Sequence, residues 1–132
     1  DHFLAIPSDI KQIERVQDFA HHVLSNSSYP SDIRHDIILA LQEGVNNAIK
    51  HGNGNDSQHE VYIKMTLYES HLEMRIRDKG IGFDRDCLGD PTSPEQRMRC
   101  NGRGLLFIEN YMDEICFARE ADYHELKMVL YR

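Results

Sequence analysis

The chain has 132 residues, 40% of them hydrophobic and 28% charged, which is typical of one soluble globular domain with a single core. Its net charge of −7, from 15 basic and 22 acidic residues, comes without a basic stripe and argues against direct nucleic-acid binding. No apolar run approaches the ~20 residues that cross a bilayer, and the start lacks a signal-peptide pattern, so we expect no membrane insertion.

The cysteines and histidines predict neither a disulfide framework nor a histidine-rich metal site. Cys87, Cys100 and Cys116 are irregularly spaced, which favours a reducing, cytoplasmic setting. The eight histidines include no HExxH motif and no i, i+4 pair.

The amino-terminal segment predicts a strand followed by a helix. Residues 2–6 read as a short strand, and Ser8 is positioned to cap the helix. The apolar positions at helical spacing are Ile10, Ile13, Val16, Phe19, Ala20 and Val23.

A loop and a second helix follow. Residues 25–30 have loop composition, and Ser31 or Asp32 is expected to cap a helix that runs to about His51 and stops at Gly52.

The rest of the chain predicts strands around one irregular stretch. Residues 60–68 and 71–77 alternate apolar and polar side chains and are joined by two residues, as in an antiparallel hairpin. Residues 84–101 form a connection too long for a plain loop, which is typical of a lid or binding loop. A third helix is expected from Gly104, and strands at 114–119 and 124–131 complete the chain.

These elements predict an α+β fold in one domain spanning residues 1–132. The expected architecture is a two-layer sandwich, in which a mixed, mostly antiparallel sheet carries the helices on one face.

Three constellations carry chemistry, and the first is a polar row on the second helix. At about 100° per residue, Glu43, Asn47 and His51 fall within about 80° of one another. The apolar stripe of this helix is expected to lie opposite, at Ile37, Ile38, Leu41, Val45, Ala48 and Ile49. Taken alone, such a row is also typical of a solvated helix face.

The second constellation is Asp78-Lys79-Gly80-Ile81-Gly82 directly after a predicted strand. Glycines spaced by one residue let the backbone approach a ligand closely, and a carboxylate accepts a hydrogen bond from an exocyclic amine such as that of adenine. In isolation the same residues describe an ordinary strand-ending turn.

The third constellation is Asn101-Gly102-Arg103-Gly104-Leu105 at the start of an apolar helix. Helix N-termini attract anions, and Arg97, Arg99 and Arg103 add positive charge suited to phosphate. No Gly-Lys-Ser or Gly-Lys-Thr follows, so this is not a Walker A loop.

In this order, the three constellations resemble the Bergerat-type ATP-binding fold shared by gyrase, histidine kinases and mismatch-repair ATPases. Within it, EGVNNAIKHGN (43–53), RDKGIGFD (77–84) and DPTSPEQRMRCNGRGLLFIENYMDEICF (90–117) resemble the anti-sigma-factor serine kinases. The resemblance covers nearly the whole chain and implies an ATP lid at about 84–103.

The resemblance also implies roles. Glu43 would act as general base, Asn47 would ligate Mg²⁺, and Asp78 would read adenine. Cofactor-binding positions would further include His51, Gly80, Gly82, Gly102, Arg103, Gly104 and Leu105. The cofactors would be ATP and Mg²⁺. The substrate would be an anti-anti-sigma-type protein, with a sigma factor as a further partner and a homodimer as the assembly.

Some alternatives stay open at this stage. The adjacent Asn46 permits a register shift of one residue, although the helical wheel favours Asn47. The domain is also compatible with an ATP-binding module that sequesters a regulator without kinase activity, with the catalytic domain of a histidine kinase, and with a structural protein that binds no nucleotide.

Overall fold

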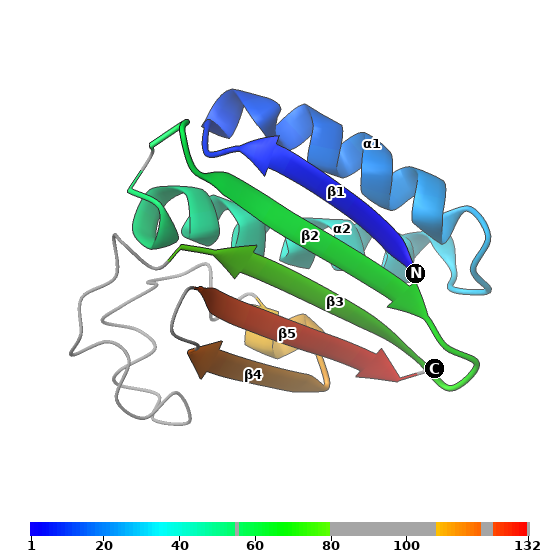
Figure 1. Cartoon of the computed structure of the whole chain (residues 1–132). Helices are drawn as coiled ribbons and strands as arrows, with labels where there is room; N and C mark the ends of the chain where they lie inside the picture. Colours follow the sequence, from blue (N-terminus) through cyan, green and yellow to red (C-terminus); the bar gives the residue numbers. More distant parts are fainter. Residues whose placement is uncertain (55, 80–107, 120–122, 132) are drawn as a thin grey trace.

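A computed structural model describes residues 1–54, 56–79, 108–119 and 123–131, except for the side chain of His51. Five strands form one sheet in the order β1-β2-β3-β5-β4. Figure 1 shows two helices, α1 (Ile13–Leu24) and α2 (Ser31–Asn47), together on one face of this sheet. The strands are β1 (His2–Pro7), β2 (Glu60–Leu67), β3 (His71–Asp78), β4 (Glu114–Arg119) and β5 (His124–Tyr131).

The predicted α+β sandwich is therefore confirmed, with a more regular sheet than expected. The sequence allowed for a mixed sheet, whereas the four pairings that join these strands are antiparallel. Among the described residues, no helix has the length and apolar character needed to span a membrane.

The core lies between the helices and one face of the sheet. Alternation along β2 and β3 places Ile63 opposite Ile76 and Met65 opposite Met74, with all four side chains buried. The largest fully buried side chains are Ile6, Leu24, Ile37, Leu41, Ile49, Ile63, Met65, Leu72, Met74, Ile76 and Ile108. These residues come from α1, from α2 and the turn that follows it, from the short helix at 108–111 and from three neighbouring strands, so one core holds the two layers together.

The first helix does not begin as the sequence predicted. Ser8 is buried, and its hydroxyl donates to the carbonyl of His59 at 2.5 Å instead of capping the helix. The cap is Asp9, whose carboxylate accepts from the backbone N–H of Lys11 at the start of a 3₁₀ turn, Ile10–Gln12 (η1). The serine lies too close to the strand end, where its hydroxyl is already engaged with the chain entering β2.

The second helix begins at Ser31, so neither Ser31 nor Asp32 is its cap. The cap residue is Pro30, which makes no side-chain capping bond, and its carbonyl accepts from the backbone N–H of Arg34 at 2.9 Å. Proline holds φ near its fixed value (here −62°), which starts the helix without a capping side chain.

The second helix ends in a wider turn than an α-helix has. Residues Ala48–Gly52 (η2) form a π-helical turn, in which the N–H of Asn53 donates to the carbonyl of Ala48 at 2.8 Å. The predicted end near His51 and Gly52 is confirmed. The extra residue in this turn changes the direction of the chain at the point where it leaves the helix.

The third helix is described only from Ile108, and residues 108–111 are helical. In Figure 1 this short orange helix lies on the same side of the sheet as α1 and α2. Its predicted start at Gly104, the stretch 84–101 and the proposed lid at 84–103 lie outside the described residues.

Candidate functional site

Glu43 and Asn47 lie along the edge of the buried face of α2. All six positions predicted for the apolar stripe of this helix are buried, which confirms that part of the wheel. Ala40 and Gly44 are buried as well, at about 60° and 100° from Glu43. Glu43 and Asn47 are therefore half-buried at the border of the stripe, and the expectation that they lie opposite it was wrong.

The two flanks of α2 face different neighbours. On one flank, the side-chain amide of Gln17 in α1 donates to Gln42 Oε1 at 2.8 Å. On the other, a Cβ added at Gly44 would lie 2.6 Å from Cδ1 of Ile76 and 3.2 Å from Cδ2 of Leu126. The missing side chain at Gly44 thus lets α2 lie close to β3 and β5. On the helical wheel, Glu43 lies between these two flanks, and Asn47 lies toward the flank of Gly44.

Asp78 is the last residue of β3, and strand alternation places it on the helix side of the sheet. It shares that face with Met74 and Ile76 and is only 6% exposed. A Cβ at Gly52 would lie 2.5 Å from Asp78 Oδ1 and closer still to Cγ and Oδ2. The end of the helix that carries Glu43 and Asn47 is therefore packed directly against the carboxylate of Asp78.

A histidine that the sequence analysis did not select lies beside Asp78. His124 of β5 pairs with Asp78 across the sheet, and its Nδ1 lies 3.9 Å from Asp78 Oδ1. Arg119 of β4 is the partner of His124 on the other side. Burial first, and then the positive charge of Arg119, lowers the pKa of the His124 imidazole below its usual value. Asp78, His124 and Arg119 form a row across three strands that becomes visible only from the strand pairing, because no local sequence motif predicts it.

A second missed residue, Asn53, joins the helix end to the three neighbouring strand ends. It is fully buried, and its Oδ1 accepts from the backbone N–H of Lys79 at 2.7 Å. Its Nδ2 donates to Ser8 Oγ at 2.7 Å and to the carbonyl of Glu60 at 3.2 Å. In the sequence, Asn53 follows the helix-ending Gly52 directly and closes the family-like segment 43–53, but no role was assigned to it.

The structure thus brings together some of the predicted site residues. Glu43 and Asn47 lie one turn apart on α2, and Asp78 packs against the end of the same helical run. His51 belongs to the π turn, but its side chain lies outside the described atoms. Both glycine-rich segments also lie outside the described residues, so Gly80, Gly82, Gly102, Arg103, Gly104 and Leu105 stay predictions.

Asn46, the alternative to Asn47, is half-buried as well. Its side-chain oxygen is buried without a hydrogen-bond partner within the described part of the chain. A buried amide oxygen that accepts no hydrogen bond is destabilising until a donor group pairs with it.

The donor set on α2 suits Mg²⁺ shared with a ligand. Within the described residues, no group of three or more His, Cys, Asp or Glu side chains gathers as a metal cage. Mg²⁺ is usually held by one or two protein oxygens together with phosphate oxygens and water, and the amide of Asn47 fits that pattern.

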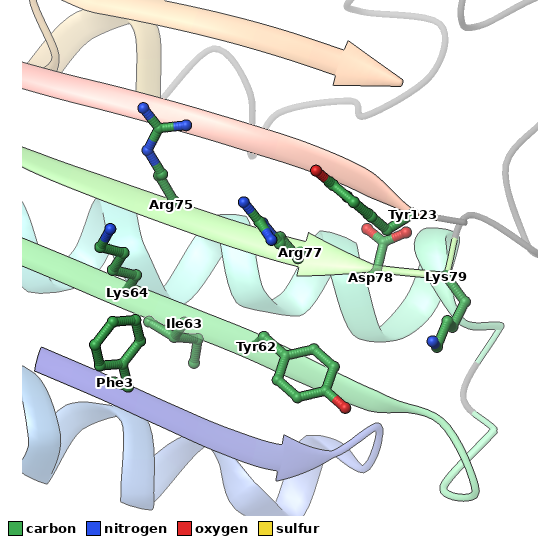
Figure 2. Close-up of a pocket in the computed structure, with 9 residues that line it drawn as sticks. All are labelled: Phe3, Tyr62, Ile63, Lys64, Arg75, Arg77, Asp78, Lys79 and Tyr123. Carbon is green, nitrogen blue, oxygen red and sulfur yellow. The ribbon is translucent and has the colours of Figure 1, made fainter. Parts of the chain in front are cut away.

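The opposite face of the sheet carries a separate hollow of about 490 Å³. Figure 2 shows Tyr62, Lys64, Arg75 and Arg77 projecting from this face, with the helices behind the sheet. The hollow is lined by Phe3, Tyr62, Ile63, Lys64, Arg75, Arg77, Asp78, Lys79 and Tyr123. Because Glu43 and Asn47 lie on the helix side, the hollow is not the space that they border.

Comparison with known families identifies the kind of domain to which these residues belong. Residues 6–130 match the family described as the histidine kinase-like ATPase domain. The chain belongs to this family. Membership implies ATP binding.

Named relatives agree with the resemblance to anti-sigma-factor kinases. A serine-protein kinase RsbW of Listeria monocytogenes is 27% identical over 99 residues, covering 70% of this chain and 63% of the relative. An anti-sigma F factor of Priestia megaterium is 41% identical over 85 residues, covering 61% and 56%. One of Oceanobacillus iheyensis is 35% identical over 82 residues, with the same coverage. The matched segments thus span between about half and two thirds of these relatives.

Two solved structures share the fold. The SiaB–SiaC complex from Pseudomonas aeruginosa contains a chain that aligns with a TM-score of 0.73 at 16% identity, covering 98% of this chain and 88% of that one. The RsbU and RsbW domains of a Mycobacterium tuberculosis protein align with a TM-score of 0.67 at 17% identity, covering 98% and 31%. At such identities, the likeness concerns the fold alone.

Proposed function

We propose that this domain binds Mg-ATP and transfers the γ-phosphoryl group to a serine or threonine hydroxyl of a small regulatory protein. The observation that carries the proposal is the contact between Gly52, at the end of the α2–η2 run, and the carboxylate of Asp78. It puts a carboxylate suited to an adenine amine at the end of the helical run that carries Glu43 and Asn47.

In the proposed reaction, Glu43 accepts the proton of the attacking hydroxyl. The hydroxyl oxygen forms a bond to the γ-phosphorus, the bond from that phosphorus to the β–γ bridging oxygen breaks, and ADP leaves. When bound, Mg²⁺ neutralises charge on the triphosphate, and Asn47 is the residue proposed to hold it. Asp78 anchors the adenine end through its buried carboxylate.

The names of the relatives support the class of partner. Because relatives are named serine-protein kinase RsbW and anti-sigma F factor, we propose an anti-anti-sigma-type protein as the phosphate acceptor. A sigma factor is the proposed target of sequestration, and a homodimer is the proposed assembly.

The test is a phosphoryl-transfer assay with γ-labelled ATP, Mg²⁺ and purified anti-anti-sigma-type proteins encoded beside the gene of this chain. We expect label on the acceptor in an acid-stable form, because phosphoserine and phosphothreonine survive acid whereas phosphohistidine does not. Glu43→Ala should lower transfer about 10²- to 10⁴-fold with nucleotide affinity nearly unchanged, the usual range for loss of a general base.

Gln42→Ala is the matched control, because its side chain faces α1 on the other flank of the same helix. Its transfer rate should stay close to that of the parent protein. Less than a tenfold loss for Glu43→Ala would overturn the general-base role. ATP binding with no transfer to any acceptor would indicate a sequestering module, and acid-labile label would indicate histidine-kinase chemistry.

A further inference from the structure

We propose that Asn53 is a positioning residue for the nucleotide site, holding the backbone at the point where β3 ends and the first glycine-rich segment begins. The inference rests on the ATP-binding part of the proposed function. It assigns a role to a side chain outside the three sequence constellations and with no expected contact with ATP.

The first step is the completeness of the hydrogen bonding around Asn53. The side chain is fully buried and makes three bonds, to Lys79, Ser8 and Glu60. Its partners fix the orientation of the amide, because the N–H of Lys79 can only donate and the carbonyl of Glu60 can only accept. Ser8 Oγ donates onward to the carbonyl of His59, so it must accept from Asn53.

The second step is where these bonds act. The N–H of Lys79 belongs to the peptide group that directly follows Asp78. A peptide group is planar, so holding its N–H also fixes the carbonyl of Asp78 and the direction in which the chain leaves the strand. The amide of Asn53 therefore sets the orientation of the peptide group that joins Asp78 to Lys79. Figure 2 shows Asp78 and Lys79 side by side at this strand end.

The third step is the link to the helix. The π turn brings Gly52 against the carboxylate of Asp78 and places Asn53, one residue later, within reach of Lys79. The backbone N–H of Asn53 is itself tied to Ala48 at 2.8 Å. Two successive residues thus position the adenine end of the site. Gly52 leaves space for the carboxylate of Asp78, and Asn53 binds the backbone N–H of Lys79.

The test compares Mg-ATP affinity by calorimetry with thermal unfolding of the same variants. Asn53→Ala loses all three side-chain bonds, and we expect it to weaken Mg-ATP binding about tenfold or more, since small misplacements of a site cost one to two orders of magnitude. Ser8→Ala loses the bonds on the β1 side and keeps the bond to Lys79, so it should lower the melting temperature while affinity changes less than about threefold.

A kinetic readout separates positioning from general loss of structure. In the transfer assay, Asn53→Ala should raise KM for ATP by about the same factor as Kd, with kcat changed much less, because the affected end is remote from Glu43. Affinity losses that follow melting temperature equally in Ser8→Ala and Asn53→Ala would overturn the inference, as would full affinity in Asn53→Ala.

A second pair of variants decides the question if Asn53→Ala does not fold. Lys79→Pro removes the N–H that binds Asn53, whereas Lys79→Ala keeps it and removes only the side chain. Affinity should fall in the first variant and persist in the second, and equal affinities would overturn the inference. Failure of the parent protein to bind Mg-ATP would instead refute the proposed function.

Discussion

At the residue scale, the absence of a side chain at Gly52 shapes the site as much as any charged group does. Its backbone is not in the left-handed region, which among the described glycines is occupied by Gly54 at φ 59°. A larger residue at position 52 is therefore disfavoured by a steric clash and not by backbone conformation. The space is filled by the carboxylate of Asp78, so the glycine and the aspartate form one feature.

We expect Gly52→Ala to weaken Mg-ATP binding nearly as much as Asp78→Asn does. The added methyl group would overlap Asp78 and displace the carboxylate from its position. Losing a hydrogen bond to a charged group costs about 1.5–3 kcal/mol, which corresponds to roughly a 10- to 100-fold rise in Kd. Calorimetry on both variants checks this prediction, and unchanged affinity in either would contradict the role given to Asp78.

At the scale of elements, the side of the sheet opposite the helices is held by interleaved charges. Strand register places Lys64, Arg75 and Lys127 in one cross-strand row. Such like charges would repel, but Glu125 accepts from Arg75 Nη1 at 2.6 Å and from Arg77 Nε at 2.5 Å. Burial alone would raise the pKa of Glu125, but the hydrogen bonds from Arg77 and Arg75 lower it.

Glu125→Ala should therefore destabilise the fold, by about 1–2 kcal/mol, at the low end for a charged hydrogen-bonded group because both arginines are partly exposed. The loss should shrink in high salt, which screens the repulsion left among the cations. Urea unfolding at low and high ionic strength measures both effects. Glu60→Ala, an exposed change on β2, is the control and should stay within about 0.5 kcal/mol of the parent.

At the scale of the whole molecule, a buried histidine at one end of the sheet links stability to pH. His124 lies buried between Asp78 and Arg119, and its lowered pKa means that the folded state prefers the neutral imidazole. The unfolded chain takes up a proton on this histidine as the pH falls below about 6.5, before the folded state does. The contribution of His124 to the free energy of unfolding is therefore complete above that pH and is lost as the pH falls toward the pKa of the folded state.

We expect the parent protein to lose more stability between pH 7.5 and pH 5 than His124→Gln loses. Glutamine has no proton to take up in this range, so its variant should lack the part of the slope that comes from His124. Urea unfolding across this range, without nucleotide, provides the measurement. Equal slopes in the two proteins would show that His124 does not carry this pH dependence.

The sequence by itself determined the elements, the layer arrangement and the family. Periodicity placed the strands and the α2–η2 run within a residue or two, because apolar spacing reflects which face of each element is buried. The motifs selected Glu43, Asn47 and Asp78 as candidates because the proposed chemistry depends on residue type and local spacing. The cap of the first helix was misplaced because Ser8 makes a long-range bond that no local pattern records, and that of the second because Pro30 starts the helix without a capping side chain.

Only the tertiary structure decided how these parts meet. The close approach of α2 to β3 and β5 depends on the missing side chain at Gly44. His124 and Asn53 acquire importance through strand pairing and through contacts between residues far apart in the chain. Such contacts form only when the helix layer packs on the sheet. Residue type alone does not predict them, because asparagine and histidine are also common on solvent-exposed surfaces.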